Sequence, residues 1–461
     1  MNQSEQFSPT EALATFGANL RFEDLPTGVV SRMKMSLLDS LGCCIHGATL
    51  PWSRIVADMC LREDSKPVAT ILGQARRSSA ALAALANATA GHAFELDDIH
   101  KESVVHAGSI ALPVTLAMAE EQQAMSGADF LTAMVAGYEV GHRVGSAATT
   151  SLFFRGFHPQ GTSGVFVAAA SAARALGLPA HQFQHALGIV GSQAGGLMAA
   201  QEGAMVKRFH SGRAAQSGVY AAFLAKESFT GVLDVLEASY GGYLTSYSDE
   251  PNVARLLSGL GETWETLSVG YKPHASVTSI HTALDCLDEL MKEHAFDADA
   301  IDQMQVGLSR MTHVHCAWPY KAQGVTAAQM NLFYGLAVIA IDREAFTEQY
   351  AQERLADERI LSFIEKITAT IDPEIDAEGA AARHACRLHV QLNDGRAFER
   401  FKADRHGSPT NPLTEAEIVR KFERVVAKCV PEAGSRRIVD VVSDIERLPT
   451  IVPLIDALRF C

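Results

Sequence analysis

The sequence predicts a mainly α fold, with a large all-helical domain and a smaller α+β domain. The chain has 461 residues, which is too long for one ordinary core, so two domains are expected. Residues 1–266 carry apolar side chains at three- and four-residue spacing, the period of a helix. Residues 267–407 mix this period with strand-like alternation. The helical period resumes in 408–461, which we expect to return to the first domain.

The helices expected in the first domain are rich in alanine and glycine. Small side chains let helices approach closely, so this composition predicts a compact bundle that is apolar on most faces. Ser78 or Ser79 is the expected N-cap of the helix that leads into the acidic segment. The expected helical segments are 29–47, 76–98, 127–148, 162–178, 181–200 and 212–228.

The α+β domain is expected from alternating segments. Residues 301–310 and 365–376 alternate like strands. Two further alternating runs lie within 386–404 and flank Asn393-Asp394-Gly395, a turn typical of a β-hairpin. Helices intervene, for example at 277–294, and the helical period is clear again at 414–430.

Composition limits the partners. The net charge of −14 and the pI of about 5.6 argue against nucleic acid and anionic membrane as partners. An anionic small substrate would need a local basic pocket. The eight cysteines are scattered without a C-x-x-C pair, which disfavours a zinc knuckle or an iron–sulfur motif. The N-terminal residues show no signal-peptide pattern and no apolar run is long enough to cross a bilayer, so we expect a cytoplasmic protein.

The segment GHAFELDDIHKESVVHAGS, residues 91–109, concentrates titratable groups in an otherwise apolar region. Carboxylates and imidazoles ligate divalent metals, but the spacing fits no H-E-x-x-H template, so a metal site is the less favoured interpretation. A carboxylate that orients an imidazole would instead transfer protons near neutral pH. A solvated helix end is the third interpretation. The titratable residues are His92, Glu95, Asp97, Asp98, His100 and His106.

Two more segments carry candidate groups. In FFRGFHPQGTSG (153–164), His158 lies in a glycine-bearing loop before an apolar helix, where free N–H groups attract anions. A loop histidine with structural hydrogen bonds is the alternative. In EGAMVKRFHSGRAAQSG (202–218), four basic or potentially basic residues predict a carboxylate-binding site, or else a charged surface cluster. They are Lys207, Arg208, His210 and Arg213.

The α+β domain adds weaker candidates. Lys272 lies in SVGYKPHASVTSIH (268–281), where the period changes and where pockets often form between domains. Tyr334 is the polar residue of an apolar stretch (331–342), and a core tyrosine is the commoner case. The short sequence HVH (313–315) carries no pattern.

Together these segments resemble the MmgE/PrpD family, which includes 2-methylcitrate dehydratases, cis-aconitate decarboxylases and iminodisuccinate epimerases. ELDD with a following HAGS is similar to the family's acidic segment, and GFHPQGTSG to its GFHPTGTxG motif. MVKRFHSGRAAQSG resembles K-P-x-H-x-G-x-A-A, and YKPHASVTSIHTALD resembles YKPYP…H. NLFYGLA is similar to S-x-x-Y-x-x-A. The motifs cover nearly the whole chain in order.

The resemblance implies an α+β lid over the helical domain, a homodimer, and a site between the domains that needs no metal or organic cofactor. Its site residues carry over onto Glu95 or Asp97, His106, His158, Lys207, Lys272 and Tyr334, and all of these except Lys272 are expected to be catalytic. We expect the substrate, a small anionic carboxylic acid, to be bound by Lys272, Arg213, His210, His100 and Asp98.

Three departures bear on the activity. Ile99 replaces a hydroxyl residue, although His100 follows it; Arg208 replaces the proline of K-P-x-H; and Val277 stands where decarboxylases carry a histidine. On these grounds cis-aconitate-type decarboxylation is the least favoured family activity.

The leading hypothesis is a cofactor-independent lyase, a 2-methylcitrate dehydratase-like hydro-lyase. It would remove a proton next to a carboxylate of a small di- or tricarboxylic acid. His106 and His158 would serve as base and acid, with Tyr334 on the lid side. The alternatives are an epimerase of a dicarboxylic acid such as iminodisuccinate, a decarboxylase, a carboxylate-binding protein that kept the fold, and a metal-dependent hydrolase.

Overall fold

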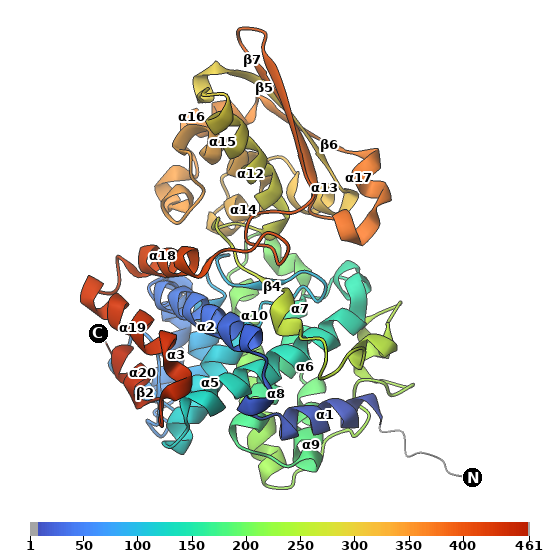
Figure 1. Ribbon diagram of the computed structural model, residues 1–461, viewed down its shortest axis with the longest axis vertical. Helices are drawn as coiled ribbons and strands as arrows, with labels where there is room; N and C mark the ends of the chain where they lie inside the picture. The colour runs from blue at the N-terminus through green and yellow to red at the C-terminus, as the bar shows by residue number, and fades with distance from the viewer. Residues whose placement is uncertain (1–7, 460–461) are drawn as a thin grey trace.

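The computed structural model describes residues 8–459 and has two bodies, a broad helical one and a narrower one that carries a sheet (Figure 1). The mainly α prediction is confirmed. Residues 1–7, where no signal peptide was expected, and Cys461 lie outside the described residues. Within residues 8–459, no helix has both the length and the apolar character needed to cross a membrane.

The helical body is a bundle built largely from the first part of the chain. Its alanine-rich α4 is buried along its whole length and packs against α5 and α10. A Cβ on Gly212 would lie 2.2 Å from Thr89 Oγ1, so α10 approaches α4 this closely only because the residue is glycine. The main helices are α1 (Pro9–Asn19), α2 (Thr27–Ala48), α3 (Pro51–Arg62), α4 (Ala80–Gly91), α5 (Gly108–Gln122), α6 (Gly127–Phe154), α8 (Gly164–Ala175), α9 (Ala180–Gly191) and α10 (Val206–Lys226).

Two predicted helices are shorter than expected. The helix predicted for 76–98 is α4, which starts after Ser79 and ends at Gly91. The titratable segment that follows is a loop, whose β3 (Ile99–His100) pairs with β4 (Val269–Gly270). Likewise α9 ends at Gly191, and a loop occupies much of the rest of 181–200. Gly91 is the last residue of α4, and Gly195 and Gly196 follow the end of α9, so glycine favours both early ends.

The α+β body contains a four-stranded sheet in the order β6-β5-β7-β8. Strand β5 (Ile301–Leu308) pairs parallel with β6 (Ile367–Ile371) and antiparallel with β7 (Cys386–Leu392). The predicted hairpin is confirmed, since β7 pairs with β8 (Ala397–Lys402) and Gly395 has a φ of 89° in the turn. The main helices of this body are α12 (Thr278–Glu293), α13 (Arg310–Cys316), α14 (Val325–Gln329), α15 (Leu332–Asp342), α16 (Glu358–Ile364) and α17 (Pro373–Ala377).

Buried apolar residues form two clusters. The first spans Leu13 to Tyr271 and resumes from Leu413 to Leu458, so α18 (Glu415–Val426), α19 (Glu432–Ser443) and α20 (Val452–Ala457) pack on the helical body. The second lies in the α+β body. Two clusters do not by themselves define two domains, so the domain boundaries at 267 and 408 stay a prediction.

The loop after α4 joins the two clusters. Phe94 and Leu96 belong to the apolar cluster of the α+β body although their chain segment lies in the helical body. Because they alternate with Glu95 and Asp97, inserting the apolar side chains into that core holds the two carboxylates beside the junction of the bodies.

Candidate active site

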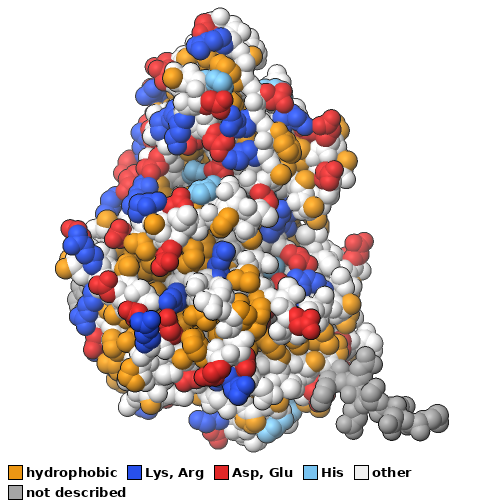
Figure 2. All heavy atoms as spheres, viewed as in Figure 1, with side chains coloured by type: hydrophobic (Ala, Val, Ile, Leu, Met, Phe, Trp, Pro, Cys, Tyr) orange, Lys and Arg blue, Asp and Glu red, His pale blue; other side chains and the backbone are white. Residues whose placement is uncertain are grey.

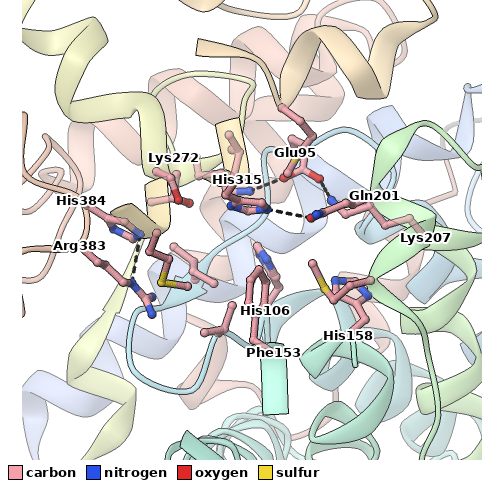
Figure 3. A pocket seen from close by; sticks show the side chains of 18 residues that line it. Glu95, His106, Phe153, His158, Gln201, Lys207, Lys272, His315, Arg383 and His384 are labelled. Carbon is pink, nitrogen blue, oxygen red and sulfur yellow. Dashed lines mark hydrogen bonds and ion pairs between the residues drawn. The ribbon is translucent and has the colours of Figure 1, made fainter. Parts of the chain in front are cut away.

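A small cavity of about 70 Å³ lies at the junction of the two bodies (Figure 3). Glu95, His106, His158 and Lys207 of the helical body line it, together with Lys272 from the segment that crosses between the bodies. Five of the predicted site residues, distant in sequence, therefore meet in one place.

Glu95 is the centre of a buried cluster of cations. Its Oε1 accepts hydrogen bonds from Lys207 and, at 2.6 Å, from Arg208 Nη1, and its Oε2 accepts one from Lys272 Nζ at 3.1 Å. Burial opposes ionisation of Glu95, but the three cations hold its pKa well below the usual range. Glu95 also has a φ of 53°, an uncommon backbone conformation for a side chain of this kind.

Asp97 orients imidazoles. His92 Nδ1 lies 2.7 Å from Asp97 Oδ2, and His106 Nδ1 lies 3.4 Å from Asp97 Oδ1. Burial opposes the charge of Asp97, yet His106, His92 and Lys272 lower its pKa, so the carboxylate is ionised. The resulting carboxylate–imidazole pairs match the proton-transfer interpretation of the segment.

His106 is set up as a base. Its Nδ1 lies 2.7 Å from the backbone carbonyl oxygen of Asp98, which can only accept a hydrogen bond. Nδ1 therefore carries the proton, and Nε2 of the neutral ring keeps a lone pair. Burial lowers the pKa of His106 to about 3 against the opposing charge of Asp97, so the ring is neutral near pH 7.

His158 has a second histidine behind it. The Nδ1 atoms of His158 and His210 lie 2.8 Å apart, so one of them donates to the other. His158 lines the cavity and His210 does not. Burial lowers the pKa of His158 well below its ordinary value and that of His210 to about 4, so both rings are neutral near pH 7. His210 supports His158 rather than facing the cavity.

Six predicted residues do not line the cavity: Asp97 and His210, which contact the lining residues His106 and His158, and also Tyr334, Arg213, His100 and Asp98. Tyr334 on α15 is fully buried in the α+β body, where its hydroxyl donates to the Gln349 carbonyl at 2.6 Å. Arg213 is exposed and donates to Gln216 on its own helix. It points away from the cavity because it follows Lys207 by six positions, which is a rotation of about 240° around the helix axis. These placements correct the prediction that both residues contact the substrate.

His100 and Asp98 are buried beside the site. His100 Nε2 lies 3.1 Å from Glu265 Oε2. Asp98 accepts from the Tyr138 hydroxyl at 2.6 Å and from the Gly108 amide at 3.0 Å, and burial raises its pKa to about 7. Direct substrate binding by these two side chains is therefore also corrected, although the Asp98 carbonyl sets the tautomer of His106.

The α+β body supplies residues that sequence patterns do not single out. His315 on α13 lines the cavity, and its Nε2 lies 2.8 Å from Gln201 Oε1 of the helical body. Arg383 and His384 line it from the segment before β7. Burial lowers the pKa of His315 to about 4. No periodic signal marks these residues, because they lie in a short helix and an irregular segment.

One group of side chains resembles a metal site. The ligand atoms of His92, Asp97 and His106 lie within 4.8 Å of one another. However, Lys272 Nζ lies 3.7 Å from Asp97 Oδ1, and the proton on His106 Nδ1 blocks that atom as a ligand. The donor set thus suits proton transfer better than a cation.

This fold, with titratable side chains gathered in a cavity at the junction of its two bodies, is that of an enzyme, and comparison with known proteins gives the family. Residues 11–255 match the MmgE/PrpD N-terminal domain, and residues 274–447 match the MmgE/PrpD C-terminal domain. The chain belongs to the MmgE/PrpD family.

Its relatives match over nearly their full length. The cis-aconitate decarboxylase-like protein oryM of Aspergillus oryzae is 32% identical over 460 residues, covering 95% of this chain and 94% of that protein. The cis-aconitate decarboxylase of Aspergillus terreus is 29% identical over 470 residues, covering 98% and 96%. The cis-aconitate decarboxylase of Homo sapiens is 26% identical over 454 residues, covering 96% and 92%.

Proposed function

We propose that this protein is a cofactor-independent lyase that acts on a small di- or tricarboxylic acid by proton transfer at carbon next to a carboxylate. The observation that carries the proposal is the neutral His106, whose Nδ1 proton is fixed by the Asp98 carbonyl, in one cavity with Lys207 and Lys272. The names of the relatives support the substrate class.

The charge of the site fits an anionic substrate. The cations that line the cavity or pair directly with its lining are Lys207, Arg208, Lys272 and Arg383, and the carboxylates are Glu95 and Asp97. With neutral histidines, four positive and two negative charges leave +2. The whole chain carries −14, and acidic and basic side chains alternate over the face shown in Figure 2. The cavity therefore offers a dianion a complementary charge, although the protein as a whole is acidic.

The proposed chemistry begins at the substrate carbon beside a carboxylate. When His106 Nε2 takes a proton from this carbon, the electron pair of the C–H bond moves into the carboxylate, and Lys207 and Lys272 stabilise the enolate-like charge. In dehydration, this pair then expels a β-hydroxyl group, which leaves as water after His158 or His315 donates a proton. Reprotonation from the opposite face would instead give an epimer.

We propose loss of carbon dioxide as the first candidate reaction, and loss of water, which begins with proton removal by His106, as the second. In decarboxylation, the C–C bond to the departing carboxylate breaks, its electron pair stays on the carbon skeleton, and a histidine N–H protonates that skeleton. Val277 stands where decarboxylases carry a histidine, and this departure alone would argue against decarboxylation. His315 and His384 supply other imidazoles in the cavity lining, and the apolar Met311 and Met330 favour neutral carbon dioxide over a carboxylate.

The test is proton NMR in deuterated water on chelator-treated protein. The panel contains cis-aconitate, citrate, 2-methylcitrate, malate and iminodisuccinate. Dehydration gives a new alkene signal, and decarboxylation gives a product that has lost a carboxylate and gained a deuterium on its carbon skeleton. Deuterium exchange with inversion and no elimination indicates an epimerase. Binding of these acids with no exchange at all would contradict the proposal and favour a carboxylate-binding protein.

We also propose a homodimer in the cytoplasm. Exposed apolar side chains follow one another along α10 and the segment after it: Tyr220, Leu224, Phe229, Val232, Leu233 and Tyr240. Such a run of exposed apolar residues is typical of an interface. Sedimentation of the wild type and of Leu224→Glu tests this: the wild type should sediment as a dimer and the variant as a monomer.

A further inference from the structure

Arg383 is a buried cation without a counter-ion. Its residue is 5% exposed, and it lines the cavity. Its guanidinium donates to the backbone carbonyl of Lys101 and, at 3.2 Å, to His384 Nε2. Among residues 8–459, the ion pairs within 4.0 Å include none between Arg383 and a carboxylate.

A comparison with another buried arginine shows what is missing. Arg143 is fully buried too, but Glu139 and Glu265 lie 3.8 and 3.9 Å from its guanidinium, and three backbone carbonyls accept its protons. Arg383 lowers the pKa values of Lys101, His315 and His384, none of which carries negative charge. Asp404 and Asp376 lie with Arg383 in the walls of neighbouring cavities, but neither forms an ion pair with it. Burial lowers the pKa of Arg383 to about 10, which still leaves it charged at neutral pH. A buried, uncompensated charge is costly for the fold.

The position of Arg383 relates it to the rest of the site. In Figure 3, Arg383 and His384 lie on one side, Lys207 and His158 lie on the other, and His106 and His315 lie between them. Arg383 also forms part of the walls of two neighbouring cavities, of about 500 and 580 Å³. It therefore stands at the outer end of the candidate active site, away from the Glu95 cluster.

We propose that Arg383 binds the substrate carboxylate that lies farthest from the reacting carbon, and that it selects di- and tricarboxylic acids over monocarboxylic acids. This inference rests on the proposed function. A carboxylate would supply the missing counter-ion, and the planar guanidinium can hold it through two parallel hydrogen bonds. The cost of the unpaired cation in the free protein is then recovered when the substrate binds.

The experiment measures binding of an inert probe, propane-1,2,3-tricarboxylate, by calorimetry, with butanoate as a probe that has a single carboxylate. Arg383→Met should weaken tricarboxylate binding about 30-fold and change butanoate binding by less than about threefold. Arg383→Lys keeps the positive charge but cannot form the two parallel hydrogen bonds of a guanidinium, so its affinity for the tricarboxylate should be intermediate. The matched control is Arg310→Met in the neighbouring cavity, where the arginine side chain is 69% exposed and pairs with Asp376. It should bind the tricarboxylate as the wild type does.

Thermal unfolding separates this role from a structural one. Because Arg383→Met removes an uncompensated buried charge, it should raise Tm, whereas loss of a structural arginine would lower it. Tricarboxylate binding within about twofold of wild type, or equal losses for both probes, would overturn the inference. Lys207→Met distinguishes a failure of the proposed role of Arg383 from a failure of the proposed function. If it weakens binding while Arg383→Met does not, only the role of Arg383 fails; if neither variant matters, the proposed function fails as well.

Discussion

The ammonium group of Lys421 lies 2.7 Å from the backbone carbonyl oxygen of Leu96 and donates a hydrogen bond to it. The same nitrogen lies 2.6 Å from Asp39 Oδ1, and all three residues are buried. Leu96 stands between Glu95 and Asp97. A lysine near the end of the chain thus fixes the loop that presents both carboxylates, and it compensates the uncommon backbone conformation of Glu95.

Replacing Lys421 by methionine should destabilise the protein by about 3 kcal/mol, because Asp39 would be left buried without a cation. Turnover should also fall, since the loop that holds Glu95 and Asp97 loses its anchor. Urea unfolding and steady-state kinetics measure the two effects. Arg424→Met on the same helix is the control: Arg424 is half exposed and pairs with Glu344, so its loss should cost less than about 1 kcal/mol. Equal stabilities of the two variants would refute the anchoring role.

Replacing His106 by glutamine should lower kcat by a factor of about 10² to 10⁴, the usual contribution of a general base. The glutamine amide keeps a donor for the Asp98 carbonyl, so Tm should change little. His389→Gln on the exposed part of β7 serves as the control and should retain full turnover. Wild-type kcat in His106→Gln would assign the base to another residue.

Glu95→Gln should have opposite effects on stability and on anion binding. The substitution leaves Lys207, Arg208 and Lys272 buried without their shared carboxylate, so unfolding should become easier by about 3 kcal/mol. The same three cations should then bind propane-1,2,3-tricarboxylate more tightly than in the wild type. Calorimetry measures the tricarboxylate affinity and urea unfolding measures the stability, both on the same preparation of the variant. Weaker binding by Glu95→Gln would show that Glu95 itself contacts the ligand favourably.

Stability should fall as the pH decreases from about 6.5 toward 4. Burial lowers the pKa of His106 to about 3 and the pKa values of His46 and His315 to about 4, from an ordinary value of 6.5. The unfolded chain binds protons in this range that the folded chain does not, so each such histidine favours unfolding in acid. The buried carboxyls of Asp98 and Glu139, whose pKa values are raised to about 7, oppose this trend in part.

Measurement of Tm across this pH range tests the prediction. His46→Gln removes a histidine outside the cavity lining and should flatten the acid limb of the curve without changing binding at pH 7. A Tm that rises steadily from pH 6.5 to pH 4 would mean that the carboxyls outweigh the histidines.

The sequence predicted the fold class and five residues of the cavity because the relevant signals are local. Alanine-rich periods identify the helices, and the concentration of acids and histidines in residues 91–109 identifies the candidate groups, although the helix was expected to extend to residue 98. Tyr334 was misplaced because its helix period shows that it is buried but not in which core. Arg383 and His315 were missed because their position depends on how the two bodies meet, which no short segment encodes.

The chain crosses between the two bodies twice, and the two crossing segments are joined by hydrogen bonds. The Tyr271 amide donates to the Gly407 carbonyl at 2.8 Å, and Arg405 donates to the Tyr271 carbonyl. The α+β body is therefore an insertion whose entry and exit are adjacent. A short linker from Gly270 to Ser408 would remove it and leave His106, His158 and Lys207 on the helical body, while Lys272, Arg383 and His315 would be lost. The proposed general base and the proposed site for the distal carboxylate thus belong to different, separable segments of one chain.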